Sequence, residues 1–335
     1  MRYDVNGVMT DGPLFVSSGD MITDRNYRAA LQRASRGDLE GAAQILRQTV
    51  ELAPTFATAW FALGAIRDNL GDFEGAIAAW GRARDLDPDD YHGARLQLAR
   101  LGAGEQTPAM TTAYLRRLFD QQALRFDDTL MERLDYRGPT VLLEAVLRVL
   151  PHSRLGSMLD LGCGTGLAGA AFRPHVDVLV GVDVAPRMIA QARAKGLYDR
   201  LAVGDLQSFL ATEANARARY HLIVAADVFV YVSDLGPAIG AAARVLAPGG
   251  LLTFTVETHA GDGPMLQQTL RYAHGAAHVR MAVAKAKLDL LQLNHAETRT
   301  EMGTPVASLA AVASNPALRR STSDPGSELG REEEV

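Results

Sequence analysis

The 335-residue chain has 34 lysine and arginine residues against 39 aspartate and glutamate residues, a formal net charge of −5. The basic residues are scattered among acids, without a basic patch interleaved with aromatic residues, which argues against nucleic-acid binding. A hydrophobic content of 47% is typical of a soluble globular protein, and the length suits two domains. The single cysteine, Cys163, excludes an intrachain disulfide. No apolar run is long enough to span a membrane or to form a signal peptide, so a cytoplasmic location is expected.

The first 104 residues contain an internal repeat. Residues 1–23 are expected to be a flexible N-terminus. Beyond them, Gly37–Pro54 and Gly71–Pro88 align at a period of 34 residues, with glycine paired to glycine and proline to proline. Between these segments Trp60, Leu63, Gly64 and Arg67 follow helical spacing.

This pattern resembles the tetratricopeptide repeat, a helix-turn-helix unit of 34 residues. Small residues such as Gly64 allow close helix approach, and Trp60, Phe73 and Trp80 are expected to fill the groove between the helices. We therefore expect an all-α tetratricopeptide-repeat domain over 24–104, capped by a helix in "YHGARLQLARLG". The repeats are expected either to dock a partner on a concave surface or to pack on a second domain or a dimer partner.

The remainder predicts an α/β domain over 110–313. Residues 102–108 have linker composition, and 110–150 are helical in pattern. From Met158 onward, short apolar runs alternate with helical stretches, as in a doubly wound parallel sheet. Residues 314–335 are polar, end in acids and are expected to form a disordered tail.

The glycine-rich stretch "MLDLGCGTGLAG", Met158–Gly169, fits two cofactor classes. It reads as GxGxG of S-adenosylmethionine enzymes or, shifted by two, as GxGxxG of dinucleotide sites. Asp183, at the end of the next predicted strand, suits a ribose in both cases. Asp160 disfavours a dinucleotide, because a carboxylate there suits a cationic amino-acid group and repels a pyrophosphate.

Further motifs follow in order: "GVDVAPRMIAQAR", "GD" at Asp205 and "LAPGG". Together with the glycine loop they resemble the class I S-adenosylmethionine-dependent methyltransferases, with a Rossmann-like sheet. "FDQQALRFDD", Phe119–Asp128, resembles a lid segment of ubiquinone-biosynthesis-type methyltransferases. With the repeats in front, the chain is similar to bacterial methyltransferases that contain tetratricopeptide repeats.

The resemblance implies S-adenosylmethionine as cofactor and a set of residues around it. The implied cofactor-binding residues are Asp160, Gly162, Cys163, Gly164, Gly166, Asp183, Val184, Met188, Asp205, Leu206 and Ala225. For some of these residues a purely structural role is an alternative. Cys163 suits a small loop residue, Met188 a helix core and Asp205 a helix N-cap.

The acceptor side offers fewer signals. His259 and Tyr231 are the candidate catalytic residues, because a base is needed when the acceptor is protonated at neutral pH. The candidate substrate-binding residues are Phe119, Phe126, Tyr272, His274 and Arg299. No regular metal-ligand spacing occurs, so no metal is expected.

The leading hypothesis is methyl transfer to a small-molecule or carrier-bound acceptor, with the repeats docking a partner or substrate. The alternatives are an adaptor that binds S-adenosylmethionine without turnover, a protein methyltransferase and a dinucleotide-dependent oxidoreductase.

Overall fold

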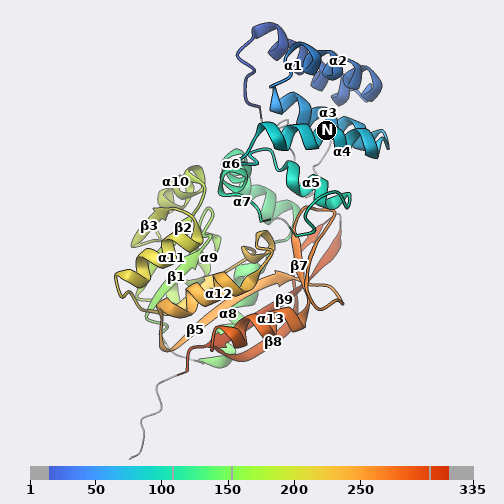
Figure 1. Ribbon diagram of the computed structural model, residues 1–335. Coiled ribbons are helices and arrows are strands. Elements are labelled where there is room, and N and C mark those ends of the chain that lie inside the picture. The colour runs from blue at the N-terminus through green and yellow to red at the C-terminus, as the bar shows by residue number, and fades with distance from the viewer. Residues whose placement is uncertain (1–14, 108, 152–153, 302, 317–335) are drawn as a thin grey trace, which may run out of the picture.

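The computed structural model describes residues 15–107, 109–151, 154–301 and 303–316. A group of helices stands at one end of the molecule, and a sheet with helices on both faces follows (Figure 1). Residues 1–14 of the expected flexible N-terminus and 317–335 of the expected tail lie outside the described residues. None of the described helices is long and apolar enough to cross a bilayer.

The helical region contains two antiparallel helix pairs and a shorter fifth helix. These are α1 (Met21–Ser35), α2 (Leu39–Leu52), α3 (Ala57–Asn69), α4 (Phe73–Leu86) and α5 (Ala94–Arg100). The 34-residue period is visible in the caps. Asp38 accepts a hydrogen bond from the Gly41 amide at 2.9 Å, and Asp72 accepts one from the Gly75 amide at 2.9 Å. Helix α1 begins at Met21, three residues before the predicted limit of this domain.

Close helix approach within the second repeat depends on Gly64. A Cβ atom there would lie 2.5 Å from Trp80 Nε1, so no larger residue fits without displacing the indole. Trp80 is fully buried, as expected for a groove-filling residue. The expectation for Phe73 was wrong, because its side chain at the start of α4 is 54% exposed.

The second region is a nine-stranded sheet of order β3-β2-β1-β4-β5-β7-β6, with β9 pairing antiparallel to β5 and β8 to β9. Strands β1 to β5 are mutually parallel where they pair, as the alternating pattern predicted. The strands are β1 (Ser157–Leu161), β2 (Val178–Asp183), β3 (Arg200–Val203), β4 (Tyr220–Ala225), β5 (Leu246–Glu257), β6 (Pro264–Leu266), β7 (Tyr272–His274), β8 (Asp289–Glu301) and β9 (Thr304–Ser314).

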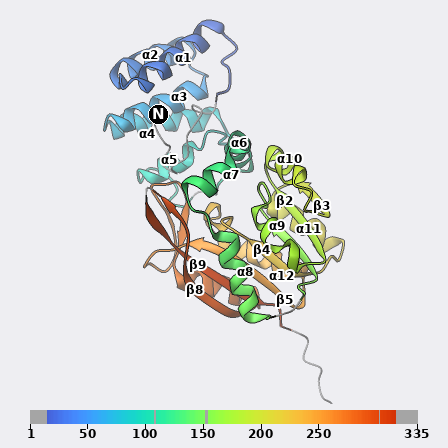
Figure 2. The ribbon, with the colours of Figure 1, turned by 180° about the vertical axis from the view of Figure 1, so that it is seen from behind.

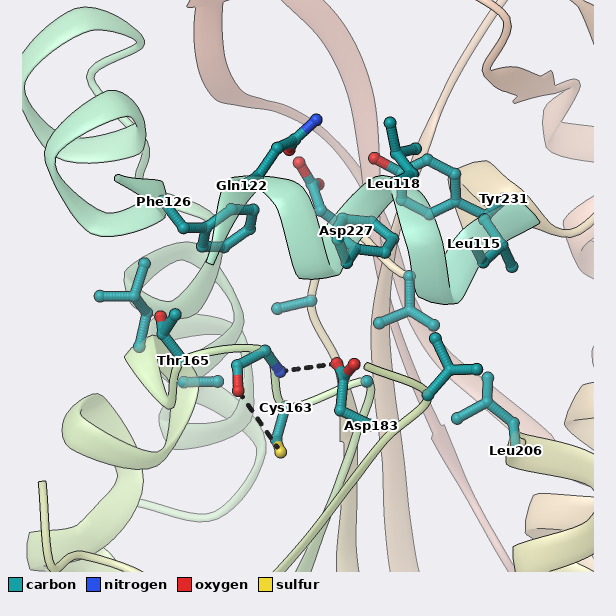
Figure 3. A pocket seen from close by; sticks show the side chains of 18 of the residues that line it. Leu115, Leu118, Gln122, Phe126, Cys163, Thr165, Asp183, Leu206, Asp227 and Tyr231 are labelled. Atoms are coloured by element: carbon teal, nitrogen blue, oxygen red, sulfur yellow. Dashed lines mark hydrogen bonds between the residues drawn. The ribbon is translucent and has the colours of Figure 1, made fainter. Parts of the chain in front are cut away.

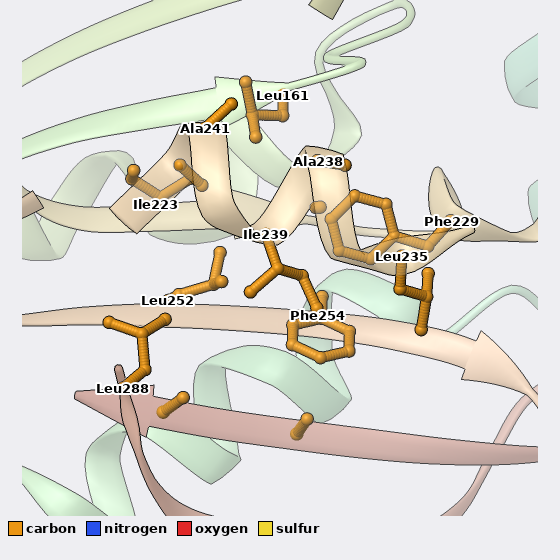
Figure 4. Packing of buried hydrophobic residues seen from close by; sticks show 14 of the residues in the cluster. Leu161, Ile223, Phe229, Leu235, Ala238, Ile239, Ala241, Leu252, Phe254 and Leu288 are labelled. Carbon is orange, nitrogen blue, oxygen red and sulfur yellow. The ribbon is translucent and has the colours of Figure 1, made fainter. Parts of the chain in front are cut away.

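Helices cover both faces of the sheet. Apolar residues of α11, α12 and α13 pack on one face (Figure 4), and those of α8 and α9 pack on the other. The bounds are α6 (Thr112–Gln122), α7 (Phe126–Asp128), η1 (Thr129–Arg133), α8 (Gly138–Val149), α9 (Leu167–Phe172), η2 (Arg173–His175), α10 (Pro186–Ala194), α11 (Leu206–Asn215), η3 (Phe229–Tyr231), α12 (Leu235–Val245) and α13 (Ala276–Lys285). This is the predicted doubly wound, Rossmann-like architecture.

The segment after β5 differs most from the sequence expectation. Tyr272 and His274 are predicted to bind substrate, but the segment forms the hairpin β6–β7 and places Tyr272 in a fully buried strand. The long hairpin β8–β9 adds two further antiparallel strands beside β5. Both views show α5 and α6 between the repeats and this end of the sheet (Figure 2).

Candidate active site

A cavity of about 700 Å³ lies where β1, β2 and β4 end, beneath helix α6 (Figure 3). Ligand sites of doubly wound sheets lie at this edge, because the strand order reverses there and the loops on either side separate. We name its two sides by their residues. The glycine-loop half contains Asp160, residues 162–165 and Asp183, and the arginine half contains Asp227, Tyr231 and Arg271.

The glycine-loop half is held by backbone hydrogen bonds to one carboxylate. Asp183 Oδ2 accepts from the Gly164 amide at 2.9 Å, and Oδ1 accepts from the Ala185 amide at 2.8 Å. Gly162 has φ +64°, and a Cβ atom there would lie 2.6 Å from a Val228 methyl group. The tight turn therefore requires glycine at this position.

Two buried carboxyl groups face this half. Burial, together with the nearby Asp183 charge, raises the pKa of Asp160 to about 7, against the lowering effect of a 2.7 Å hydrogen bond from Tyr198 Oη. Burial likewise raises the pKa of Asp183 to about 6, against the lowering effect of its amide donors. A cation or a hydroxyl donor in the cavity would favour the ionised form of both groups.

The arginine half combines residues from distant parts of the chain. Tyr231, on η3, accepts a 2.8 Å hydrogen bond from Arg271 Nη2, and Arg271 Nη1 lies 3.2 Å from Glu257 Oε1. Asp227 follows β4 with φ +55°, an uncommon backbone conformation for a residue other than glycine. Its amide donates to Thr255 Oγ1 at 2.8 Å, which holds this conformation at the sheet edge.

A buried arginine stands behind Asp227. Arg299 is 2% exposed and donates to Asp227 Oδ2 at 3.0 Å, to Glu257 Oε1 at 2.5 Å and to Glu301 Oε1 at 2.7 Å. Three carboxylates and two guanidinium groups thus share one compact network. Buried ions need such partners, because each one alone would lose its hydration without compensation.

Helices α6 and α7 cover the cavity. Phe119 and Phe126 line it as an edge-to-face pair with ring centroids 6.2 Å apart, and Phe119 also meets Tyr231 edge-to-face at 5.2 Å. Asp127 accepts from Thr165 Oγ1 in the glycine loop and from Lys195 Nζ, which lies 2.6 Å away. The covering segment is therefore fastened to both the loop and α10, as expected of a lid.

Within the described residues, no three His, Cys, Asp or Glu side chains are grouped to hold a metal ion. Aliphatic side chains form much of the cavity wall, and carboxylates, glycine backbone and aromatic rings lie among them.

Two segments of the chain match known family models. Residues 134–294 match the model of the methyltransferase domain family, and residues 57–90 match a tetratricopeptide repeat. Over these residues the chain is similar to methyltransferases, and ahead of them it is similar to a tetratricopeptide repeat. The match favours the S-adenosylmethionine reading of the glycine loop over the dinucleotide reading.

Three curated relatives are similar to part of this chain. Human methyltransferase-like protein 27 is 33% identical over 49% of this chain and 65% of its own length. The ubiquinone biosynthesis O-methyltransferase of Bradyrhizobium sp. (strain ORS 278) is 35% identical over 28% of this chain and 37% of its own length. The malonyl-[acyl-carrier protein] O-methyltransferase of Enterobacter lignolyticus is 28% identical, over 44% of this chain and 56% of its own length.

The chain therefore spans about one to two thirds of these relatives. Among solved structures, the N-methyltransferase NodS of Bradyrhizobium japonicum is 25% identical, with a TM-score of 0.42, over 57% of this chain and 99% of its own.

Most of the residues predicted for the cofactor line the cavity of the methyltransferase domain. These are Asp160, Gly162, Cys163, Gly164, Asp183, Val184, Asp205 and Leu206. Burial raises the pKa of the Cys163 thiol well above its ordinary value, which suits a small loop residue rather than a nucleophile. Asp205 also N-caps α11, where Oδ1 accepts from the Gln207 and Ser208 amides at 3.0 and 3.1 Å.

Three predicted cofactor residues lie outside the lining. Gly166 is the N-cap of α9 and packs against Tyr198, and Met188 is fully buried in the core between α10 and α6. Ala225 is fully buried at the end of β4, and the lining begins with the next residue, Ala226. For these three, packing against neighbouring elements is the observed role.

The prediction of His259 as a base needs correction. It is not among the cavity-lining residues, and both ring nitrogens are engaged within its own loop. The Gly261 amide donates to Nδ1 at 3.0 Å, so Nε2 carries the hydrogen and donates to the Gly263 carbonyl at 2.8 Å. Tyr231 does line the cavity, and so do Phe119 and Phe126.

Three predicted substrate residues are buried beside the cavity rather than in its wall. Tyr272 is strand core. His274 lies 3.0 Å from His278, Nδ1 to Nδ1, and 3.2 Å from the Phe229 carbonyl. Arg299 lies near the end of β8 and reaches the cavity only through Asp227.

The sequence analysis did not select Arg271, Asp127 or Asp227. Arg271 gave no local signal because its partners, Tyr231 and Glu257, are 40 and 14 positions away.

Proposed function

We propose that the protein transfers the methyl group of S-adenosylmethionine to a small-molecule or carrier-bound acceptor. One observation carries the proposal. A single cavity joins the glycine loop and Asp183 to a polar second half at Tyr231 and Arg271, under one lid. Its volume of about 700 Å³ lies within the range of ligand pockets, roughly 300–1,000 Å³. Two ligand groups can therefore meet in one enclosed space.

The glycine-loop half has the donor set that this cofactor needs. Asp183 is placed to accept from ribose hydroxyls, and Asp160 offers a carboxylate for an ammonium group. Apolar surface for an adenine ring comes from Val184 and Leu206. S-adenosylmethionine, when bound, supplies a methyl group already activated by the sulfonium.

The chain itself then has to orient the acceptor and exclude water. Phe119 and Phe126 cover the cavity with apolar rings. The phenol oxygen of Tyr231 accepts from Arg271, so the phenol hydrogen can be donated to an acceptor group in the cavity. Asp227, held by Thr255 and Arg299, presents a carboxylate to the same space.

The segment that covers the cavity favours a small acceptor, or one on a slender carrier arm, over a folded protein surface. Residues from α6 through η1 contribute much of the lining, so a bulky acceptor would have to displace this segment. In this proposal the repeat region docks a carrier or partner protein, since stacked helical repeats form extended binding surfaces.

Calorimetric titration with S-adenosylmethionine, S-adenosylhomocysteine and NADH tests the cofactor. We expect micromolar binding of the first two and no heat with NADH. Asp183→Ala should weaken S-adenosylhomocysteine binding about 100-fold, because it removes both a ribose acceptor and the anchor of the loop. Asp199→Ala is the matched control, since that carboxylate also accepts a backbone amide but lies outside the cavity. Equal binding by wild type and Asp183→Ala would overturn the cofactor assignment.

Incubation with methyl-labelled S-adenosylmethionine and fractionated cell extract tests the acceptor class. Label in small molecules or on a carrier arm supports the proposal. Label confined to protein side chains would make the chain a protein methyltransferase. Tight binding with no labelled product in any fraction would favour the adaptor hypothesis.

A further inference from the structure

One apolar cluster joins the repeat region, the lid and the hairpin β6–β7. Leu96 of α5 is 1% exposed, and it packs with Tyr114 of α6 and Leu270 of the β6–β7 turn. Leu266 completes the hairpin side of the cluster. A polar contact lies beside it, where Arg100 Nη1 donates to Gln268 Oε1 at 3.3 Å.

The cluster is continuous with the cavity wall on its lid side. Met110, Leu115 and Leu118 pack against it and also line the cavity (Figure 3 labels the latter two). No described residue of 15–107 lines the cavity itself. The repeat region therefore supports the wall from behind.

Leu270 occupies a strained position next to Arg271. Its φ of +58° is a conformation that favours glycine, yet the residue is a leucine and only 7% exposed. The turn is closed by the Gln267 amide, 2.8 Å from the Arg271 carbonyl, and by the Leu270 amide, 3.0 Å from the Gln267 carbonyl. Burial of the leucine side chain against α5 and α6 offsets the backbone strain, and this fixes where residue 271 emerges.

Arg271 then reaches across to the arginine half of the cavity. Its guanidinium meets the Tyr231 hydroxyl at 2.8 Å and Glu257 at 3.2 Å. A shift of the turn would move these groups relative to the glycine-loop half, which is held separately by the hydrogen bond from the Gly164 amide to Asp183.

We propose that Leu96 and Leu270 are positioning residues, through which the repeat region fixes Arg271 against Tyr231 on the acceptor side of the cavity. The repeat region thus helps to position acceptor-site residues, in addition to offering a surface outside the site. The inference rests on the proposed function only in assigning that half of the cavity to the acceptor.

Fluorine NMR of the full chain labelled with meta-fluorotyrosine tests this proposal. The Tyr231 resonance is identified among the nine tyrosines by its loss in Tyr231→Phe. Arg271→Met gives the resonance position when the guanidinium is absent. The test variants are Leu96→Ala and Leu270→Gly, and glycine suits the left-handed backbone, so the turn can persist while the side-chain contact is lost. Leu46→Ala is the matched control, a fully buried leucine of the repeat region outside the cluster.

We expect Leu96→Ala and Leu270→Gly to move the Tyr231 resonance toward its position in Arg271→Met. Leu46→Ala should leave the Tyr231 resonance at its wild-type position. Leu96→Met should also keep the resonance at that position, because methionine fills the contact that alanine leaves empty. An unmoved resonance in folded Leu270→Gly would overturn the proposal, as would an equal shift in Leu46→Ala.

Titration of the same samples with S-adenosylhomocysteine distinguishes a failure of the proposed cofactor from a failure of the positioning proposal. If wild type fails to bind, the proposed cofactor is wrong, and the resonance still tests the positioning of Arg271. If wild type binds and the resonance does not respond to Leu270→Gly, the positioning proposal alone fails.

Discussion

The two halves of the cavity are built in different ways. The glycine-loop half comes from one strand-turn-helix segment and the end of the next strand, so its carboxylates and glycines are at most 23 positions apart, from Asp160 to Asp183. The arginine half gathers Asp227, Glu257, Arg271 and Arg299 from four separate segments of the sheet edge. A local motif can specify the first half, but only the packed sheet assembles the second.

The two halves also treat buried charge differently. Asp160 and Asp183 have no cation partner among the described residues, and burial raises the pKa of both. In the arginine half, each buried carboxylate has a guanidinium within 3.2 Å. The first half is suited to receive a ligand's charge and donors, whereas the second is already compensated.

The largest effect should come from breaking the compensated half. Arg299→Met leaves Asp227, Glu257 and Glu301 short of a cation, so we expect about 3–5 kcal/mol lower stability. Arg173→Met is the control, because its pair with Asp199 is largely exposed and should contribute less than about 1 kcal/mol. Urea unfolding of both variants measures the difference. Similar losses would mean that the buried network contributes no more than a surface pair.

Acid should destabilise the core beside the arginine half through His274. Burial lowers the pKa of this histidine from 6.5 to about 4, so the unfolded chain binds more protons between these values. Stability should therefore fall as pH decreases from 6.5 toward 4, by up to roughly 3 kcal/mol. Unfolding curves across this range should be flatter for His274→Phe and unchanged for the exposed control His295→Gln. A wild-type profile as flat as that of His274→Phe would contradict the assignment.

Lower pH should weaken binding in the glycine-loop half. The pKa values of about 7 for Asp160 and about 6 for Asp183 mean that both groups lose charge as pH falls from 8 to 6. We expect S-adenosylhomocysteine affinity to fall about 10-fold over this range, because the ligand's ammonium and hydroxyls prefer carboxylates. Calorimetry on Asp160→Asn should show weaker binding and a flatter profile near pH 7. Tighter binding at pH 6 would contradict the role of both groups.

The smallest effect concerns the lid that joins the halves. Lys195→Met removes the 2.6 Å ion pair with Asp127, whose side chains are 30% and 35% exposed. Since partly exposed pairs contribute about 0.2–1 kcal/mol, S-adenosylhomocysteine should dissociate up to a few-fold faster in stopped flow. Arg154→Met breaks an equally short pair with Asp177 away from the cavity and should not alter dissociation. Equal rates in all three proteins would mean that the lid is fastened by Thr165 and the aromatic pair alone.

Much of the fold was predictable because its signals are local. The 34-residue period fixed the repeat helices, since each unit uses the same aspartate cap and glycine turn. The parallel strands were predictable from apolar runs that are buried on both faces. Each of the hairpins β6–β7 and β8–β9 pairs neighbouring segments, but the addition of β9 to β5 joins positions far apart along the chain, which no local pattern records.

The sequence by itself determined the cofactor class and most of the glycine-loop half, because turn geometry and a strand-end carboxylate are encoded within a few residues of each other. Only the tertiary structure decided the roles of Arg299, His259 and Arg271. Arg299 became a buried counter-ion 72 positions from Asp227, and His259 closed its own loop. Arg271 reached the cavity because a turn supported by the repeat region places it there. A buried charge is compensated by opposite charges that the fold places within a few ångströms. The separation of two residues along the sequence does not reveal such a contact.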